Sequence, residues 1–129
     1  MKRRHWTSTV KPVGRAGQKY VASDYMVNQA RGFIAWSLRR ILAESDRQFV
    51  HRSCVEGRFH ALGHQNRPTT PCICCGEPVG VPCSICENAW KRGLASLVQS
   101  GAIVVDGDEL VPADLEVLLA VPDPVWRAA

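Results

Sequence analysis

The sequence predicts a small α+β domain that is mostly helical, and three observations carry this prediction. Apolar residues recur at helical spacing in the long segments on either side of residues 64–86. An Asp-Gly dipeptide at residues 106–107 separates two short apolar runs, which is a strong signal for a β-hairpin. Four cysteines form two C-x-x-C pairs, a spacing typical of a tetrahedral metal site. A chain of 129 residues is expected to make one such domain.

Residues 1–21 are predicted to be a flexible basic arm. They hold six Lys and Arg and no Asp or Glu, and Pro12, Gly14 and Gly17 interrupt any regular element. Such a segment buries too little apolar surface to fold alone, so we expect it to be disordered. A phosphate backbone would order it through charge pairing. The basic residues are Lys2, Arg3, Arg4, Lys11, Arg15 and Lys19.

Residues 22–66 are predicted to form a helical region. Ser23 is a favoured N-cap residue, and an apolar stripe continues from it to about Ala43. A second helix is predicted to begin at Ser45 or Asp46 and to end at about residue 62.

Aromatic residues occupy both sides of the first predicted helix. Phe33 and Trp36 lie opposite the apolar stripe, and we expect both sides to be buried because aromatic side chains are usually in the core. The alternative is an exposed surface on which Trp36 stacks on bases while Arg39 and Arg40 bind phosphates.

Residues 67–121 are predicted to form four successive elements, and residues 122–129 are predicted to be a fraying tail. The elements are a zinc-binding loop, a third helix over residues 87–99, a β-hairpin over 102–111 and a short helix over 113–120.

The predicted metal ligands are Cys72, Cys75, Cys83 and Cys86. The first pair, followed by Gly76, has the form of a zinc knuckle, and the second pair leads into the third helix, whose N-terminus favours thiolates. A knuckle followed by a helix-borne pair is the treble-clef arrangement. Zinc is the ordinary occupant of a four-thiolate tetrahedron, and such a closed site is structural because a catalytic zinc keeps one position open.

Other arrangements of these side chains remain open. An iron–sulfur cluster or disulfides would also use paired cysteines, and Cys74 could replace a neighbour as ligand. A second metal site is suggested by the spacing of His51, Cys54, His60 and His64. On one straight helix the first two would point well away from the last two, so ordinary histidines are the expected outcome.

The run C-I-C-C-G-E-P-V at residues 72–79 resembles the opening of the zinc finger in the DksA/TraR family, whose members bind RNA polymerase and alter transcription. The resemblance spans about fifteen residues and holds only for the four cysteines and the Gly-Glu-Pro between the two pairs. It implies ligand roles for those cysteines and an association with transcription. The family's longer loop and its acidic-tipped coiled coil have no counterpart here.

The C-terminal half has the pattern of the last helix and wing of a winged helix-turn-helix domain. In such domains the helix before the hairpin enters the major groove, so Lys91 and Arg92 would contact DNA. Asp106 and Asp108 would make the wing acidic, which DNA should repel. The alternative is a hairpin that simply covers the core.

The charge distribution indicates a polyanionic partner for the N-terminal half. The formal charge is +9 over residues 1–67 and −5 over residues 68–129. No catalytic triad order, Gly-rich phosphate loop or H-E-x-x-H motif is present, so we expect no enzyme. No apolar run approaches the ~18 residues of a membrane span, and no secretory signal is visible. We therefore expect a cytoplasmic protein with no membrane contact.

Together these features predict a non-enzymatic, zinc-binding regulator that binds nucleic acid or the transcription machinery, RNA polymerase included. The alternative is a protein-interaction adaptor whose zinc module docks a partner protein without nucleic-acid contact. The salt dependence of binding distinguishes the regulator from the adaptor, because affinity for nucleic acid falls steeply as the salt concentration rises.

Overall fold

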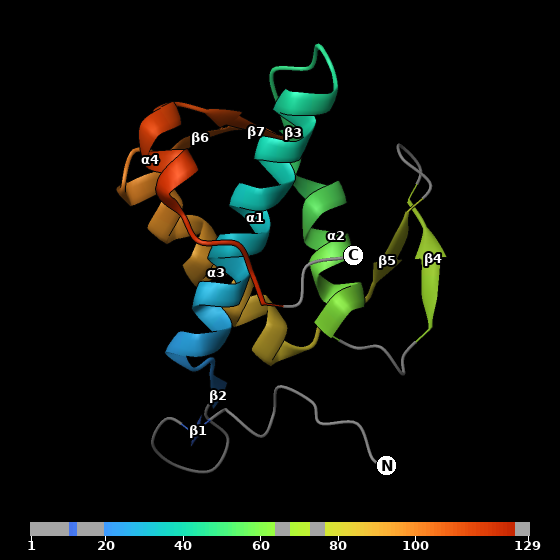
Figure 1. Ribbon diagram of the computed structural model, residues 1–129. Coiled ribbons are helices and arrows are strands. Elements are labelled where there is room, and N and C mark those ends of the chain that lie inside the picture. The colour runs from blue at the N-terminus through green and yellow to red at the C-terminus, as the bar shows by residue number, and fades with distance from the viewer. Residues whose placement is uncertain (1–10, 13–19, 64–67, 73–76, 126–129) are drawn as a thin grey trace.

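The structure is a computed structural model that describes residues 11–12, 20–63, 68–72 and 77–125. Within these ranges the chain forms four helices and three small antiparallel sheets, so the predicted α+β class is confirmed (Figure 1). The helices are α1 (Asp24–Glu44), α2 (Arg52–Gly63), α3 (Ser84–Gln99) and α4 (Leu115–Ala120). The strands are β1 (Lys11–Pro12), β2 (Tyr20–Val21), β3 (Val50–His51), β4 (Thr69–Pro71), β5 (Pro78–Gly80), β6 (Ile103–Asp106) and β7 (Glu109–Pro112).

The three longer helices pack against one another, and the sheets surround them. The sheet with strand order β3-β7-β6 lies at one end of the helices, and the β1–β2 pair lies at the other end (Figure 1). The β4–β5 hairpin packs along the outer side of α2.

The body of the protein, meaning residues 22–125 as far as the structure describes them, has the β-hairpin that the sequence predicted after the third helix. Helix α1 is followed by β3, α2, α3 and the β6–β7 hairpin, and β3 pairs with the last strand, β7. The β4–β5 hairpin, which carries the first C-x-x-C pair, is inserted between α2 and α3. The predicted β-hairpin after α3 is confirmed by the strand pairing, whereas its role as the wing of a winged helix-turn-helix domain stays a prediction.

Helix α1 is the central element of the core. It begins as predicted, because the Ser23 hydroxyl accepts a hydrogen bond from the Met26 backbone N–H at 3.3 Å. Phe33 and Ile34 are both fully buried although they lie on different sides of the helix. The expectation of burial on two sides is thus confirmed for α1.

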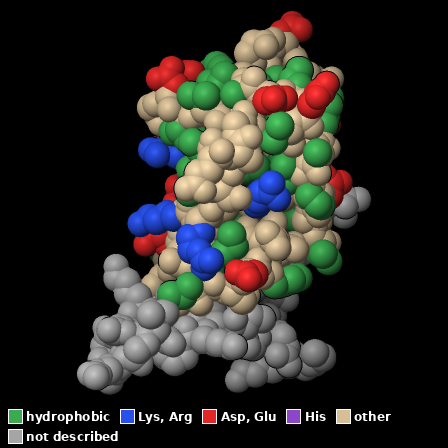
Figure 2. Space-filling view, turned by 90° about the vertical axis from the view of Figure 1, so that its left-hand side faces the viewer, with side chains coloured by type: hydrophobic (Ala, Val, Ile, Leu, Met, Phe, Trp, Pro, Cys, Tyr) green, Lys and Arg blue, Asp and Glu red, His purple; other side chains and the backbone are tan. Residues whose placement is uncertain are grey.

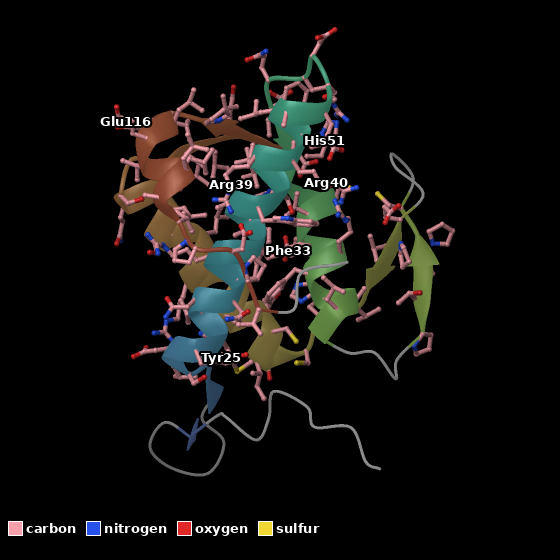
Figure 3. All side chains as sticks on the ribbon, viewed as in Figure 1. Tyr25, Phe33, Arg39, Arg40, His51 and Glu116 are labelled. Carbon is pink, nitrogen blue, oxygen red and sulfur yellow. The ribbon has the colours of Figure 1, made fainter. Side chains whose placement is uncertain are left out.

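An aromatic cluster joins the three long helices. The ring centroid of Phe59 on α2 lies 6.0 Å from that of Phe33 on α1 and 5.9 Å from that of Trp90 on α3. Figure 3 shows Phe33 at the centre of the molecule, on the α2 side of α1. This cluster fixes where α2 and α3 lie on α1.

Close contact between α1 and α3 depends on Gly93. A Cβ atom at this position would lie 2.9 Å from the Arg31 backbone nitrogen and 2.9 Å from the Ala30 Cβ. Gly93→Val is therefore expected to lower the free energy of unfolding by about 2–3 kcal/mol, since a backbone atom cannot yield as a side chain does. Urea denaturation followed by circular dichroism measures this loss.

Ala95→Val is the matched control for that prediction. Ala95 is exposed on the same helix, so the added methyl groups meet solvent and the expected loss is about 0.5 kcal/mol. A loss in Gly93→Val no larger than that in Ala95→Val would contradict the close contact between α1 and α3 at position 93.

Helix α2 begins at Arg52, so the predicted start at residue 45 or 46 is wrong. Val50 and the residue after it form β3 and pair with β7, where Val50 lies opposite Leu110. The N-terminus of α2 is capped from the β6–β7 turn: the Asp108 carbonyl accepts from the Arg52 N–H at 2.6 Å, and its carboxylate accepts from the Ser53 N–H at 3.1 Å. A cap 55 residues away in sequence leaves no local signal.

The end of α3 and the following hairpin agree with prediction. Gly101 has a φ of +83° just after the helix, and the Ala102 N–H donates to the Leu97 carbonyl at 3.1 Å. Gly107 has a φ of +61° in the two-residue turn between β6 and β7. Both positions favour glycine because other residues rarely adopt positive φ.

Helix α4 begins at Leu115, two residues later than predicted. Asp114 is its N-cap, and its carboxylate accepts from the backbone N–H groups of Glu116 and Val117. Ala113 lies outside the helix, and its backbone N–H donates a hydrogen bond to the Ala102 carbonyl at 2.9 Å.

The residues after α4 do not fray as predicted, at least as far as residue 125. Pro124 is fully buried, and the Val125 N–H donates to the Gln29 side chain at 2.7 Å. Gly32 makes this packing possible, because a Cβ there would lie 2.7 Å from the Pro122 carbonyl oxygen. This segment lies along α1, as Figure 1 shows.

The predicted arm contains a short paired segment. Lys11 lies opposite Val21, and Pro12 lies opposite Tyr20, in an antiparallel pair. The expectation of disorder is wrong for these four residues, and the rest of the arm lies outside the described residues.

Candidate functional site

The structure brings Cys83 and Cys86 together at the start of α3. Cys83 is the N-cap of the helix, and its sulfur accepts a hydrogen bond from the Cys86 backbone N–H at 3.4 Å. The two Sγ atoms are 3.1 Å apart. Cys86 is fully buried, whereas Cys83 is half-buried.

The electrostatics of this pair are dominated by the hydrogen bond between its two sulfurs. The hydrogen bond shared with Cys83, followed by burial and by the charge of Cys83, raises the pKa of Cys86 well above its ordinary value. A metal ion that replaces the shared proton would reverse this effect. Two sulfurs on one tetrahedral zinc are about 3.8 Å apart, so the pair needs only a small opening to fit.

Cys72 lies at the loop end of the β4–β5 hairpin. Its N–H donates to the Glu77 carbonyl at 2.8 Å, next to the pairing of Pro71 with Pro78. From this end β5 runs toward the start of α3 (Figure 1). Cys72 and Cys83 therefore lie near opposite ends of β5.

No group of three or more His, Cys, Asp or Glu is arranged to hold an ion among the residues that the structure describes. Cys74 and Cys75 lie outside those residues. The metal site made of Cys72, Cys75, Cys83 and Cys86 therefore stays a prediction, and the structure shows only that Cys83 and Cys86 lie close together.

Among the described residues, His51 and His60 are not grouped with Cys54 as the second metal site that the spacing suggested. His51 lies on β3 and not on a helix, with its Nδ1 atom 3.8 Å from the Asp108 carboxylate. His60 on α2 is 1% exposed, and its Nε2 atom lies 3.5 Å from the Glu56 carboxylate. Neither ring nitrogen has a hydrogen-bond partner within the described part of the chain. His64 lies outside the described residues.

Arg39, a predicted phosphate contact, holds the C-terminal segment of the body to α1. Its guanidinium donates to the carbonyls of Leu118 at 2.9 Å and Val121 at 3.0 Å and pairs with Asp123. Only 17% of its side chain is exposed. Figure 3 shows Arg39 on the α4 side of α1. Its contacts are those of a structural residue.

Arg92, another predicted nucleic-acid contact, binds Ala22, the residue at which the arm joins the body. Its guanidinium donates to the Ala22 carbonyl at 2.7 Å, and the Asn88 side chain accepts from the Ala22 N–H at 2.9 Å. Both backbone groups of Ala22 are thus bound to α3. Asn88 was missed by sequence reasoning, because nothing in the local pattern distinguishes it from other polar helix residues.

Arg40 and Lys91 present more of their charge to solvent. The Arg40 guanidinium lies 5.3 Å above the Trp36 ring and 3.4 Å from the Glu44 carboxylate. Trp36 is half-buried, so little of its ring is available for base stacking. The Lys91 side chain is 70% exposed, with its Nζ 3.9 Å from Glu87.

The described body has no continuous basic face in the view of Figure 2. Lys and Arg side chains there lie in small groups, with Asp, Glu and hydrophobic side chains between them. Residues 1–21 have a formal charge of +6, whereas residues 22–129 have a formal charge of −2. The side chains of the arm cations Lys2, Arg3, Arg4, Lys11, Arg15 and Lys19 lie outside what the structure describes.

Comparison with known proteins gives no relative: no protein-family model, curated protein or solved structure matches the chain. In the part of the chain that the structure describes, no helix combines the length and the apolar character needed to cross a bilayer.

Proposed function

We propose that the chain is a non-enzymatic regulator that binds nucleic acid through its basic N-terminal arm, with helix α3 of a winged-helix body beside the arm. The observation that carries this proposal is the attachment of Ala22 to α3 by Asn88 and Arg92. The attachment fixes Ala22, the residue that follows the +6 segment in the chain, to α3, and in helix-turn-helix proteins the helix before the hairpin enters the major groove.

The charge distribution supports the arm as the source of most of the binding energy. The body is weakly acidic, and Arg39 and Arg92 are held by backbone carbonyls of the chain itself. Arg40 and Lys91 remain as secondary phosphate contacts, because their side chains are about half exposed or more. Phosphate contacts of this kind give affinity and orientation but little sequence specificity.

A structural zinc ion is part of the proposal. The predicted ligands are Cys72, Cys75, Cys83 and Cys86, of which Cys83 and Cys86 already lie side by side at the N-terminus of α3. Zinc would supply a covalent tie between the inserted hairpin and α3, and four thiolates would leave it no open position. These cysteines would position α3 and would perform no reaction.

A second candidate function, that of a protein-interaction adaptor, is favoured by an apolar groove on the body. The groove has a volume of about 630 Å³ and lies between the C-terminal part of α1, the end of β7 and α4. Leu115 and Leu119 line it and are 56% and 66% exposed. Such a groove fits an apolar segment of a partner protein, and its binding would depend little on salt.

A labelled DNA duplex titrated with the full chain over a series of salt concentrations tests the proposal. If all six arm cations bind phosphates, the logarithm of the association constant should fall with the logarithm of salt concentration with a slope of about −5. Absence of any complex at low salt would contradict nucleic-acid binding and favour the adaptor. A salt-independent complex would contradict the role of the arm.

A further inference from the structure

The start of α3 holds two sulfur atoms within reach of a covalent bond. The Sγ atoms of Cys83 and Cys86 are 3.1 Å apart, in hydrogen-bond contact. In a disulfide the two sulfurs are about 2.0 Å apart, so the pair would have to close by about 1 Å. Two sulfurs on one zinc ion are farther apart, at about 3.8 Å, so zinc binding does not by itself account for this contact.

The N-cap position of Cys83 makes the contact possible. Residues three apart inside a helix have Cβ atoms about 5–6 Å apart, whereas the Cβ atoms of a disulfide are about 3.5–4.5 Å apart. Cys83 precedes the helix with an extended backbone, at φ −99° and ψ 167°. Its side chain turns back over the first turn, where its sulfur accepts from the Cys86 N–H at 3.4 Å. A bond between the two sulfurs therefore requires no unwinding of α3.

The two sulfurs differ in their exposure to solvent. Cys83 is half-buried, whereas Cys86 is fully buried. A dissolved oxidant can therefore reach the Cys83 sulfur, and the Cys86 sulfur lies in contact with it on the inner side. This is the arrangement of an attacking thiol that has a resolving thiol beside it.

We propose that Cys83 and Cys86 form a reversible dithiol–disulfide couple in the metal-free chain, with a small disulfide such as oxidised glutathione as the oxidant. The Cys83 sulfur attacks one sulfur of the small disulfide, whose S–S bond breaks and releases one thiol. The Cys86 sulfur then attacks the Cys83 sulfur and releases the second thiol. In total, two electrons and two protons pass from the cysteine pair to the small disulfide, which is reduced to two thiols.

Zinc and the disulfide exclude each other, because zinc binds deprotonated thiols and the disulfide offers none. This consequence rests on the zinc site of the proposed function. Oxidation would remove both ligands that α3 supplies and would untie the inserted hairpin from α3. Asn88, which binds the Ala22 N–H, follows Cys86 by two residues, so the couple lies beside the attachment of the arm. The redox state of the pair would then control how this end of α3 is held.

Incubation of the metal-free full chain, prepared with a chelator, with oxidised glutathione tests this inference. Remaining thiols are then alkylated, and tandem mass spectrometry locates the bonds. The wild-type chain should form a bond between Cys83 and Cys86 and should return to the dithiol with dithiothreitol. Cys86→Ala should instead accumulate the mixed disulfide of Cys83 with glutathione, because no second thiol displaces it. If both cysteines stay reduced, or bond only to cysteines of the hairpin, the inference is overturned.

Cys83→Ser removes the attacking sulfur but keeps a favoured N-cap residue, so the helix should be preserved while the bond is lost completely. Circular dichroism checks that the helix content is unchanged. Cys72→Ser is the matched control, since it removes a half-buried thiol from the hairpin and leaves both sulfurs of α3 in place. It should leave the bond unchanged. Loss of the bond in Cys72→Ser would assign the oxidation to the hairpin and contradict the couple.

Zinc content, measured by native mass spectrometry before and after oxidation, separates this inference from the proposed zinc site. A chain that binds zinc but forms no disulfide once the metal is removed would overturn the inference and leave the zinc site intact. A chain that forms the disulfide but never binds zinc would support the couple and contradict the zinc site. If both hold, each disulfide formed should release one zinc ion.

Discussion

Replacing the six arm cations by glutamine is expected to remove most of the salt-dependent affinity of the chain for duplex DNA. With six phosphate contacts, the wild-type chain should lose about a thousandfold in affinity between about 50 and 200 mM salt. The variant should lose far less over the same range, because residues 22–129 carry a net negative charge. The change to glutamine preserves chain length, so the attachment of Ala22 to α3 is retained. Fluorescence anisotropy with a labelled duplex measures both affinities.

The matched control neutralises two cations of the body. Arg40→Gln together with Lys91→Gln should reduce the salt slope by at most about 2, since each residue can contact one phosphate. A larger loss in this control than in the arm variant would place the nucleic-acid surface on the body and contradict the proposed role of the arm.

Phe59→Ala is expected to lower the free energy of unfolding by about 3–5 kcal/mol, which is a large part of the stability of a domain of this size. Phe59 is fully buried and contacts Phe33 on α1 and Trp90 on α3, so the lost ring leaves a cavity where three helices meet. The midpoint of urea denaturation, followed by circular dichroism, reports this loss.

Phe49→Ala removes the same ring from a place outside the three-helix junction. Phe49 is half-buried beside His51 and Arg47, so its removal should cost about 1 kcal/mol. Similar losses in the two variants would show that the aromatic cluster is not the main connection between the helices.

Elements with local signals were predicted well from the sequence. The start of α1 depends on Ser23 and the end of α3 depends on Gly101, and each effect acts within five residues. The Asp-Gly signal of the hairpin is also local, because the turn lies directly between the two strands that pair. Caps and turns are visible in a sequence because the hydrogen-bonding groups they satisfy lie next to them in the chain.

Elements held by distant partners were predicted poorly. The start of α2 is set by pairing of Val50 with Leu110 and by capping from Asp108, and the residues after α4 are held by Gln29 and Arg39. None of these partners is near in sequence. The local pattern of polar residues at residues 45–46 suggested the start of a helix there. The prolines after α4 suggested a frayed tail.

The features of the candidate site also divide into those that the sequence indicates and those that only the tertiary structure shows. By itself the sequence determined the four-helix α+β pattern, the pairing of Cys83 with Cys86 and the strong positive charge of residues 1–21. Only the tertiary structure decided that Arg39 is held by backbone carbonyls and that Cys54 shares a cavity with Cys72. The physical reason is that spacing along the chain fixes which side chains share a turn, whereas packing between helices and strands fixes which distant side chains meet.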